Sequence, residues 1–505
     1  MRGLIFILAL IFVSENGLAA DTQDLAHLVA ALPARDAPLR AFYQAHGYVP
    51  AWNKNDAAVL QGVLARAGTE GLDPGNYQIS QEKDGAAGDL ALTRAALAYI
   101  RDVREGRPAL RSLDDDVALP ASGYDAVSEL DGALASHRLA AFLSALPPPA
   151  PQYAALRTAL ATYRGISSHG GWPFLPASGA GKDEPPARLL RQRLAIEDRA
   201  FSADPNADLT AALKDFQQRH GLEADGRLGK RTLAELNISA AARAEQIAAN
   251  MERWRWMPRS LEADYILVNI PDARLALFLK GEEVLRSRVI VGKPKTPTPI
   301  LRAEDGGITV NPPWNVPNSI ARNEILPKLK ADPSYLKSQD MVLLNGPTGD
   351  PYGLGVNWRR IPAGTFPYQI QQNPGAANPL GTIKLELPNR FDVYLHDTPG
   401  KSAFARSSRD LSHGCVRVEQ ILPLASYALT ANHDAMAAIS DAVSSGATKY
   451  IPLERRLPVY FLYWTAFSDA KGDLQFRPDI YRRDARMIAA WSGRPGLVEG
   501  GGPAC

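Results

Sequence analysis

The sequence predicts a multidomain α+β protein with a helical N-terminal part, a compact three-helix unit and a β-rich C-terminal part that carries a lid-like insertion. Its 505 residues exceed one ordinary domain. The spacing of apolar residues is helical up to about residue 256 and then changes to the period of two that is typical of strands. Stretches rich in proline and glycine separate these parts.

The composition is that of a soluble globular chain and argues against several classes of partner. Hydrophobic residues make up 46% and charged residues 22%, which differs from disordered and membrane-spanning chains. Lys plus Arg (56) nearly balance Asp plus Glu (54), so no bulk charge favours nucleic acid or an anionic surface. Any electrostatic recognition must depend on local groups of charges.

The first twenty residues have the features of a secretory signal. A cationic Arg2 precedes an apolar run from Leu4 to Val13, and small residues follow before Asp21. The run is shorter than the roughly 20 residues that span a bilayer. We therefore expect residues 1–20 to be a signal peptide and the protein to be exported. An uncleaved membrane anchor is the alternative, and both interpretations place the protein outside the cytoplasm.

The middle of the chain predicts helices. Residues 21–170 are rich in Ala and Leu at helical spacing, and we expect a helical domain there. Residues 187–240 predict a three-helix unit, in which Asp208 caps the second helix and Gly221 ends it in the left-handed conformation. Residues 241–260 predict a connecting helix.

Residues 261–490 predict the β-rich domain, because apolar and polar residues alternate from Tyr265 to Leu279 and again near Val291. Residues 311–366 interrupt this pattern with Pro-rich and Gly-rich text and one helical stretch. They are either a lid-like insertion over a site or an ordinary long connection. Residues 491–505 form a Gly-rich tail.

The chain has two cysteines, Cys415 and the terminal Cys505. An exported protein of this size with two cysteines does not depend on a disulfide framework. A bond between the two is an alternative, but it would block chemistry at Cys415. A lone cysteine is commonly a small buried hydrophobe, so its neighbours decide whether Cys415 is a nucleophile.

Alternation from Phe391 to Asp397 predicts that Tyr394 and His396 share one face of a strand. An imidazole beside a thiol converts it to the nucleophilic thiolate, which makes His396 the candidate base for Cys415. A carbonyl oxygen on the other ring nitrogen would fix the tautomer. The backbone carbonyl of Asp397 is the nearest candidate for that role.

The run from Ser412 to Val418 surrounds the candidate nucleophile. If it is extended from Cys415 onward, the thiol and Arg417 share a face. Gly414 frees the backbone where a side chain would crowd an approaching carbonyl. Backbone N–H groups of Gly414 and Cys415 are candidates for an oxyanion hole, and Arg417 is a candidate to hold a substrate carboxylate.

A metal site is the alternative use of these residues. His396, His413 and Cys415 are all possible ligands, but they lack a fourth ligand and a CxxC pair. We therefore expect neither a metal nor another cofactor.

The spacing of these residues resembles a known signature. His396, fifteen intervening residues and then Ser412-His413-Gly414-Cys415 resemble the L,D-transpeptidase catalytic (YkuD-type) family. Residues 374–384 and 388–399 resemble its large periplasmic members of Gram-negative type. The unit at 187–240, with Phe216-Gln217 and Asp225-Gly226, resembles the three-helix peptidoglycan-binding domain, against the alternative of a generic helical bundle.

The resemblance assigns roles by position. It implies that Cys415 is the nucleophile and His396 the base, and that the site is lined by Tyr394, Ser412, His413, Gly414 and Arg417. Arg417 departs from the short members, which often carry Asn there, and agrees with the large ones. The family uses a backbone carbonyl to orient its base, so the side chain of Asp397 is not a predicted catalytic group.

The resemblance also implies the reaction. Such enzymes attack the bond after the third residue of a tetrapeptide stem, release D-Ala and form a 3→3 crosslink through a thioester, and their thiol reacts with carbapenems. The expected partners are peptidoglycan and, as candidates, other cell-wall synthesis enzymes. Two alternatives stay open. The first is an enzyme that attaches a protein or D-amino acid to the stem, or hydrolyses it as an L,D-carboxypeptidase. The second is a peptidoglycan-binding scaffold with an inert cysteine.

Overall fold

The computed structural model describes most of the chain, namely residues 21–79, 85–120, 122–176, 187–198, 201, 206–429, 433–453 and 455–493. The predicted signal peptide, Cys505 and the end of the predicted tail lie outside these residues. None of the helices in the described ranges combines the length and the apolar character that crossing a bilayer requires.

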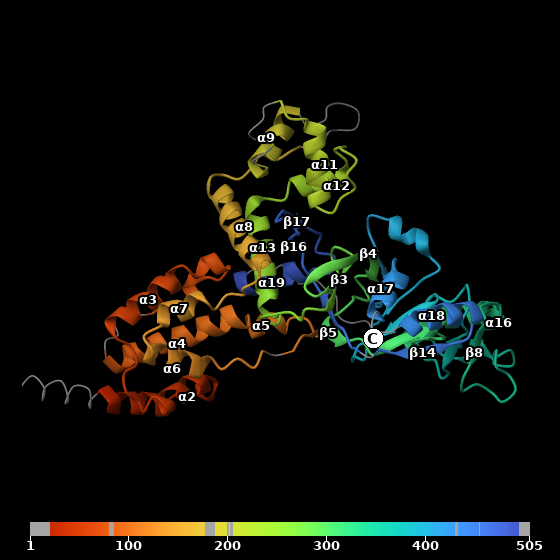
Figure 1. Cartoon of the computed structure of the whole chain (residues 1–505), viewed down its shortest axis with the longest axis horizontal. Coiled ribbons are helices and arrows are strands. Elements are labelled where there is room, and N and C mark those ends of the chain that lie inside the picture. The colour runs from red at the N-terminus through yellow and green to blue at the C-terminus, as the bar shows by residue number, and fades with distance from the viewer. Residues whose placement is uncertain are drawn as a thin grey trace, which may run out of the picture.

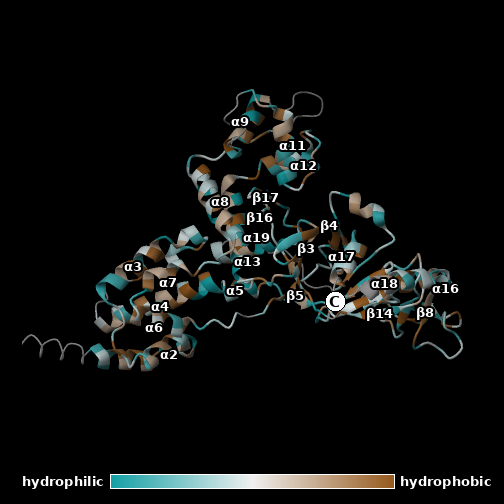
Figure 2. Cartoon of the chain, in the orientation of Figure 1, coloured by the Kyte–Doolittle hydropathy of each residue, from teal (hydrophilic) through white to brown (hydrophobic). Residues whose placement is uncertain are grey.

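The predicted α+β class is confirmed: helices occupy the chain up to Arg255 and most strands follow (Figure 1). The N-terminal part packs its apolar side chains around the long helix α4, with Phe42 and Tyr43 fully buried, and Figure 2 shows hydrophobic positions along its helices. Its main helices are α2 (Ala37–Ala45), α3 (Lys54–Ala65), α4 (Gly85–Arg104), α5 (Pro108–Arg111), α6 (Ala126–Ala135), α7 (Leu139–Ser144) and α8 (Pro151–Ser168).

The three-helix unit forms where it was predicted, from α9 (Ala187–Glu197), α11 (Leu209–Arg219) and α12 (Lys230–Leu236). Asp208 accepts a hydrogen bond from Thr210 N (2.9 Å) and caps α11, which confirms the predicted helix start. Gly221 has φ +65°, which confirms the predicted left-handed stop.

Helix α13 (Ala240–Arg255) connects the helical part to the β-rich domain. The fully buried Glu252 accepts hydrogen bonds from the backbone and guanidinium of Arg107 and pairs with Arg255 (3.0 Å). Arg255 also donates to Glu70 O and to the Tyr153 hydroxyl. These buried charges are paired, as burial requires, and they fix the N-terminal helices against α13.

One large sheet organises the β-rich part, in the order β1-β5-β15-β2-β3-β4-β13-β11-β10-β6-β14, with β12 paired to β4. Strand β11 is shorter than the predicted alternation from Phe391 to Asp397. The strands are β1 (Val117–Ala118), β2 (Tyr265–Asn269), β3 (Arg274–Leu279), β4 (Glu282–Gly292), β5 (Ile300–Glu304), β6 (Gly307–Val310), β10 (Ile383–Glu386), β11 (Leu395–His396), β12 (Asp410–Ser412), β13 (Val416–Val418), β14 (Lys449–Pro452) and β15 (Pro458–Leu462).

Shorter elements complete this part. A hairpin joins β16 to β17, and three helices pack around the sheet. Their bounds are β16 (Ala466–Ser468), β17 (Leu474–Phe476), α17 (Ile421–Ala428), α18 (His433–Ser445) and α19 (Arg483–Ser492).

The stretch predicted as an insertion has its own small core, which includes Trp358 and Phe366 stacked 6.1 Å apart. A three-stranded sheet, β7-β9-β8, closes it and extends past residue 366 to Gln372. Its elements are β7 (Trp314–Asn315), α14 (Asn318–Ile320), a π-helical turn (Ala321–Ile325), α15 (Leu326–Ala331), α16 (Tyr335–Ser338), β8 (Met341–Leu343) and β9 (Ile370–Gln372).

Candidate active site

His396 lies on β11, and Cys415 lies directly before β13, the adjacent parallel strand of the sheet. Strand β13 begins directly after Cys415, and its Arg417 is the register partner of His396 on β11. The backbone N–H of Val416 donates to Tyr394 O at 3.0 Å, which aligns Cys415 with Tyr394. Partners across a strand pair share a face of the sheet, so these four side chains lie on one face.

The opposite face enters the core. Val393, Leu395, Val416 and Val418 are at most 4% exposed. Burial of these four aliphatic side chains fixes the strand register, because a slip by one residue would place them on the other face. The predicted alternation of residues 391–397 is therefore present, although only Leu395 and His396 pair as a regular strand.

The Cys415 thiol donates a hydrogen bond to Asp392 O at 3.6 Å. Asp392 has φ +53°, a left-handed conformation that is uncommon outside glycine, and it exposes this carbonyl to the sulfur. Burial raises the pKa of the thiol, while hydrogen bonding from Tyr394 and the charge of Lys384 oppose that rise. The resting side chain of Cys415 is therefore a neutral thiol.

His396 is 4% exposed, and burial lowers its pKa to about 3. The charges of Arg417 and Lys384 lower the pKa further, while the backbone of Asp397 raises it. Nδ1 is buried and forms no hydrogen bond within the described residues. The imidazole is thus neutral at physiological pH, which is the form that a general base requires.

The carboxylate of Asp397 contacts residues other than His396. It accepts hydrogen bonds from the backbone and hydroxyl of Thr382 (3.0 Å each) and pairs with Lys401. Both the backbone of Asp397 and the charge of its carboxylate raise the pKa of His396. This geometry gives the side chain a structural role.

Tyr394 and Lys384 complete this face. The ring of Tyr394 lies edge-on to His396 with centroids 5.5 Å apart. Lys384 is the register partner of His396 on β10, and its Nζ lies 4.2 Å from the Tyr394 ring centroid. Sequence reasoning gave Lys384 no role, because the pairing of β10 with β11 is a long-range contact without a local signature.

Ser412 does not line the site as predicted. It is 2% exposed, and its hydroxyl donates to Cys415 O (2.6 Å) and accepts from Gly414 N (3.1 Å). It therefore holds the loop in shape. The Gly414 N–H is used in this contact, which differs from its predicted role in an oxyanion hole. The backbone N–H of Cys415 has no hydrogen-bond acceptor within the described ranges.

Gly414 is required by its backbone conformation. Its φ is +120°, where side chains cause strain. A Cβ there would meet its nearest heavy atom, Pro297 O, at an ordinary 3.7 Å. Crowding of an approaching substrate carbonyl, the reason inferred from the sequence, stays a prediction.

Arg417 has the environment of an unpaired cation. Its Nε is buried, and within the described residues its side chain forms no hydrogen bond or ion pair. Burial lowers the pKa of the guanidinium. A carboxylate brought by a ligand would supply the partner that is absent.

His413 faces the insertion. Its Nε2 lies 2.6 Å from Glu324 Oε1 and 3.3 Å from Lys293 Nζ. Glu324 belongs to the π-helical turn, a rare element that is frequent at functional sites. His413 therefore links the loop that carries Cys415 to the insertion. The sequence offered no signal for the contact with Glu324.

Thr298 supports the loop that carries Cys415 through a hydrogen bond to its backbone. The residue is fully buried, and its hydroxyl donates to Gly414 O (2.6 Å) and accepts from Gly292 N (2.9 Å). We expect Thr298→Val, which is isosteric, to cost about 1–3 kcal/mol of stability and to lower kcat, measured by thermal unfolding and a turnover assay. Thr296→Val is the control, because its contact to Ser412 O is longer (3.2 Å) and partly exposed. Equal losses in the two variants would contradict this role.

The raised pKa of Cys415 predicts its reactivity. Because the thiolate fraction of Cys415 near neutral pH is lower than that of a free cysteine, we expect slow alkylation by iodoacetamide at pH 7. The rate should rise continuously with a midpoint above the roughly 8.5 of free cysteine. Intact mass measured between pH 5 and 10 in a Cys505→Ser background tests this. A reactivity plateau between pH 5 and 8, typical of a thiolate–imidazolium pair, would contradict it.

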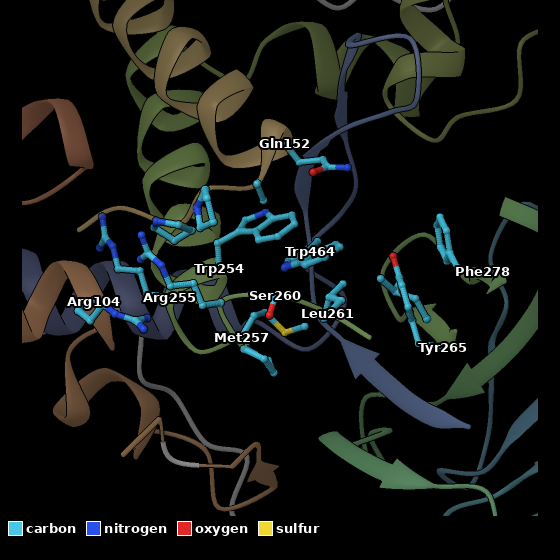
Figure 3. Close-up of a pocket in the computed structure, with 16 residues that line it drawn as sticks. Arg104, Gln152, Trp254, Arg255, Met257, Ser260, Leu261, Tyr265, Phe278 and Trp464 are labelled. Carbon is cyan, nitrogen blue, oxygen red and sulfur yellow. The ribbon is translucent and has the colours of Figure 1, made fainter. Parts of the chain in front are cut away.

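Other possible sites are separate from this one. The described residues contain no group of three or more His, Cys, Asp or Glu placed to hold a metal ion. A cavity of about 320 Å³ lies where α13 ends beside β2 and β3 (Figure 3). Its walls include Trp254 stacked on Trp464 and Tyr265 stacked on Phe278, and no predicted site residue lines it.

Three family profiles match separate parts of the chain. The scaffold domain matches residues 37–160, the "Putative peptidoglycan binding domain" matches residues 189–236, and the L,D-transpeptidase catalytic domain matches residues 263–446. The last match contains both Cys415 and His396.

Individual proteins show similarity as well. A "Putative L,D-transpeptidase" of Haemophilus influenzae is 34% identical over 285 residues, which are 55% of this chain and 56% of that relative's length. An L,D-transpeptidase structure from Mycobacterium smegmatis is 14% identical and covers 40% of this chain and 58% of its own, with a TM-score of 0.18. One from Stackebrandtia nassauensis is 13% identical and covers 57% and 97%, with a TM-score of 0.21. TM-scores this low support no statement about the fold.

Proposed function

We propose that this chain, which carries an L,D-transpeptidase catalytic domain at residues 263–446, forms 3→3 crosslinks between peptidoglycan stems through a thioester on Cys415. The observation that supports this reaction best is the shared face of Cys415 and His396 on adjacent parallel strands. A thiol and a neutral imidazole on one face are the two groups that acyl transfer through cysteine needs.

In the first half-reaction, the sulfur attacks the carbonyl carbon of the third residue of a tetrapeptide stem. His396 takes the thiol proton as the C–S bond forms. It then gives that proton to the amine of D-Ala as the C–N bond breaks, and D-Ala leaves. The Cys415 N–H is the backbone donor left to hold the oxyanion, since the Gly414 N–H donates to Ser412. The raised pKa of Tyr394 keeps its hydroxyl protonated as a further donor.

In the second half-reaction, a side-chain amine of another stem attacks the thioester. The new C–N bond forms, the C–S bond breaks, and the amine proton returns to the sulfur through His396. Water competes with the amine at this step. We propose that residues 311–366, which pair Glu324 with His413 beside the nucleophile, act as the lid that excludes water.

Arg417 provides a reason for the base to become stronger when substrate binds. Its charge lowers the pKa of His396 in the free protein. A substrate carboxylate paired with the unsatisfied guanidinium would offset that charge and raise the pKa of His396. Proton transfer from the thiol would then be favoured in the complex with an anionic stem peptide.

The other matched domains support the same location for the reaction. The peptidoglycan binding domain at residues 189–236 fits peptidoglycan as partner and substrate. We propose that the protein works in the periplasm, after export by the predicted signal at residues 1–20, and that other cell-wall synthesis enzymes are candidate partners.

A product assay tests the reaction. Purified protein is incubated with a soluble disaccharide tetrapeptide, and the products are identified by mass spectrometry. We expect a dimer that is lighter than two substrates by one D-Ala. Tripeptide alone would instead indicate hydrolysis, and exchange of the terminal residue would indicate transfer to a free D-amino acid. Absence of all three products would argue for a binding scaffold.

A second test addresses the thioester directly. A carbapenem should add its mass to Cys415, with the modified peptide located by fragmentation. The same incubation of Cys415→Ala in a Cys505→Ser background should leave the mass unchanged, and an adduct on that double variant would contradict the proposed nucleophile.

A further inference from the structure

A cleft of about 660 Å³ lies between the three-helix unit and the catalytic sheet, away from the thiol itself. One wall comes from the end of α11 and the start of α12. The other comes from β3, β4 and the segment 405–410, which runs directly into the nucleophile loop. Figure 1 shows the unit with α11 and α12 facing the part of the sheet that contains β4.

The two walls are held in a defined relation by Arg477. Its Nη1 donates to Arg219 O of the unit (2.9 Å), while its Nε pairs with Asp272 of the catalytic domain (2.5 Å). The packing is close, since a Cβ on Gly221 would lie 2.6 Å from the Arg477 side chain. Across the cleft, Arg231 Nη1 donates to Ser407 Oγ at 3.2 Å.

The lining of the cleft is positively charged. Its six cations are Arg231, Arg274, Arg288, Arg406, Arg409 and Arg477, and its three anions are Glu223, Asp272 and Asp410. Six cations minus three anions leave a net charge of +3, and Glu419, which pairs with Arg288 from outside the lining, lowers this to +2.

Besides Arg231, whose side chain contacts Ser407, two arginines of the cleft are free of acidic partners in the described part of the chain. Arg409 donates only to backbone oxygens, those of Val289, Arg406, Asp272 and Ala273. Arg406 is exposed, and its side chain has no hydrogen bond or ion pair within the described residues. A ligand that carries carboxylates would complement both.

The cleft is continuous with the catalytic loop. Asp410 and Val291, which line it, are register partners on β12 and β4, and the next partners along these strands are Ser412 and Gly292. Ser412 holds the carbonyl of Cys415, and Gly292 holds Thr298. A ligand in the cleft therefore lies two residues, roughly 7 Å along an extended strand, from the residues that support the nucleophile.

We propose that this cleft binds the carboxylate-bearing stem peptide of a peptidoglycan strand held by the three-helix unit. This assignment rests on the proposed function, because it takes its ligand from that substrate. A stem peptide offers several carboxylates, which match the unpaired guanidinium groups of the cleft. The sugars of the peptidoglycan strand are neutral. The cleft would align an anionic strand with the catalytic domain before chemistry.

The test measures binding without turnover, in full-length protein with Cys415→Ala. The probe is a soluble disaccharide tetrapeptide, compared with the peptide-free disaccharide and with the tetrapeptide whose carboxylates are amidated. We expect Arg406→Glu and Arg231→Glu each to raise the Kd for the anionic probe about tenfold at low salt. Neither variant should change the affinity for the peptide-free disaccharide. Arg456→Glu is the control, since Arg456 is an exposed arginine outside the cleft.

Each outcome decides the proposal. A Kd for Arg406→Glu within twofold of that for Arg456→Glu would overturn it, and so would equal affinity for the amidated and anionic probes. The proposal would also be overturned if an acidic protein saturated the cleft and the tetrapeptide had no effect on that binding. The proposed reaction can fail independently of the proposed role of the cleft. If the parent protein released no D-Ala while the tetrapeptide still bound through Arg406, the reaction would fail and the cleft would stand.

Discussion

Cys415→Ser is expected to abolish crosslinking, with the rate of D-Ala release falling on the order of 10⁴-fold or more. The substitution keeps the size of the side chain but replaces a thiol with a hydroxyl whose pKa is far higher. The neutral His396 would then have to deprotonate a much weaker acid. Release of D-Ala from the disaccharide tetrapeptide, followed by mass spectrometry, measures the loss.

The fold should tolerate this change. Cys415 is only half-buried, and its thiol forms a single long hydrogen bond of 3.6 Å. We expect the thermal unfolding midpoint to stay within about 2 °C. Activity within tenfold of the parent would exclude Cys415 as the nucleophile, while a large drop in the midpoint would show that the loss came from misfolding.

His396→Gln is expected to lower kcat by about 10²- to 10⁴-fold. Glutamine keeps hydrogen-bonding capacity but cannot shuttle the proton from the thiol to the leaving amine. His169→Gln is the matched control, because His169 is exposed and lies in Ser168-His169-Gly170-Gly171, which lacks the cysteine. The two variants are compared in the same D-Ala release assay, and equal activity would remove His396 from the mechanism.

The pH dependence follows from the same residue. A pKa of about 3 means that His396 is already neutral, and competent as a base, at every pH above about 4. Lowering the pH from 7 to 5 should therefore leave kcat/KM flat, and the decline at high pH should follow the raised pKa of the Cys415 thiol. A loss of activity with a midpoint near pH 6.5, the ordinary value for histidine, would contradict this environment.

Local patterns predicted much of the fold. Asp208 and Gly221 marked the ends of a helix because capping and left-handed stops depend on neighbouring residues. Alternation predicted the faces of Tyr394 and His396 because strand geometry has a period of two. Each of these signals extends over a few residues and needs no knowledge of the rest of the chain.

Roles that depend on long-range contacts were missed or assigned incorrectly. Lys384 reaches the site through the pairing of β10 with β11, and Glu324 through the packing of the insertion. Ser412 was predicted to line the site, but its hydroxyl is buried against Cys415 O. Neighbouring letters in a sequence cannot distinguish a side chain that faces the ligand from one that holds the loop.

The sequence by itself determined the α+β class, the nucleophile–base pair as a hypothesis, and the alternation that places Cys415 and Arg417 on one face, because these depend on residue type and local spacing. Only the tertiary structure decided the charge state of that pair. Burial lowers the pKa of His396, and Arg417 and Lys384 on adjacent strands lower it further. Burial raises the pKa of Cys415 against the opposing charge of Lys384. Desolvation and Coulomb interactions depend on distance in space, and the sheet sets those distances through pairings that no local pattern specifies.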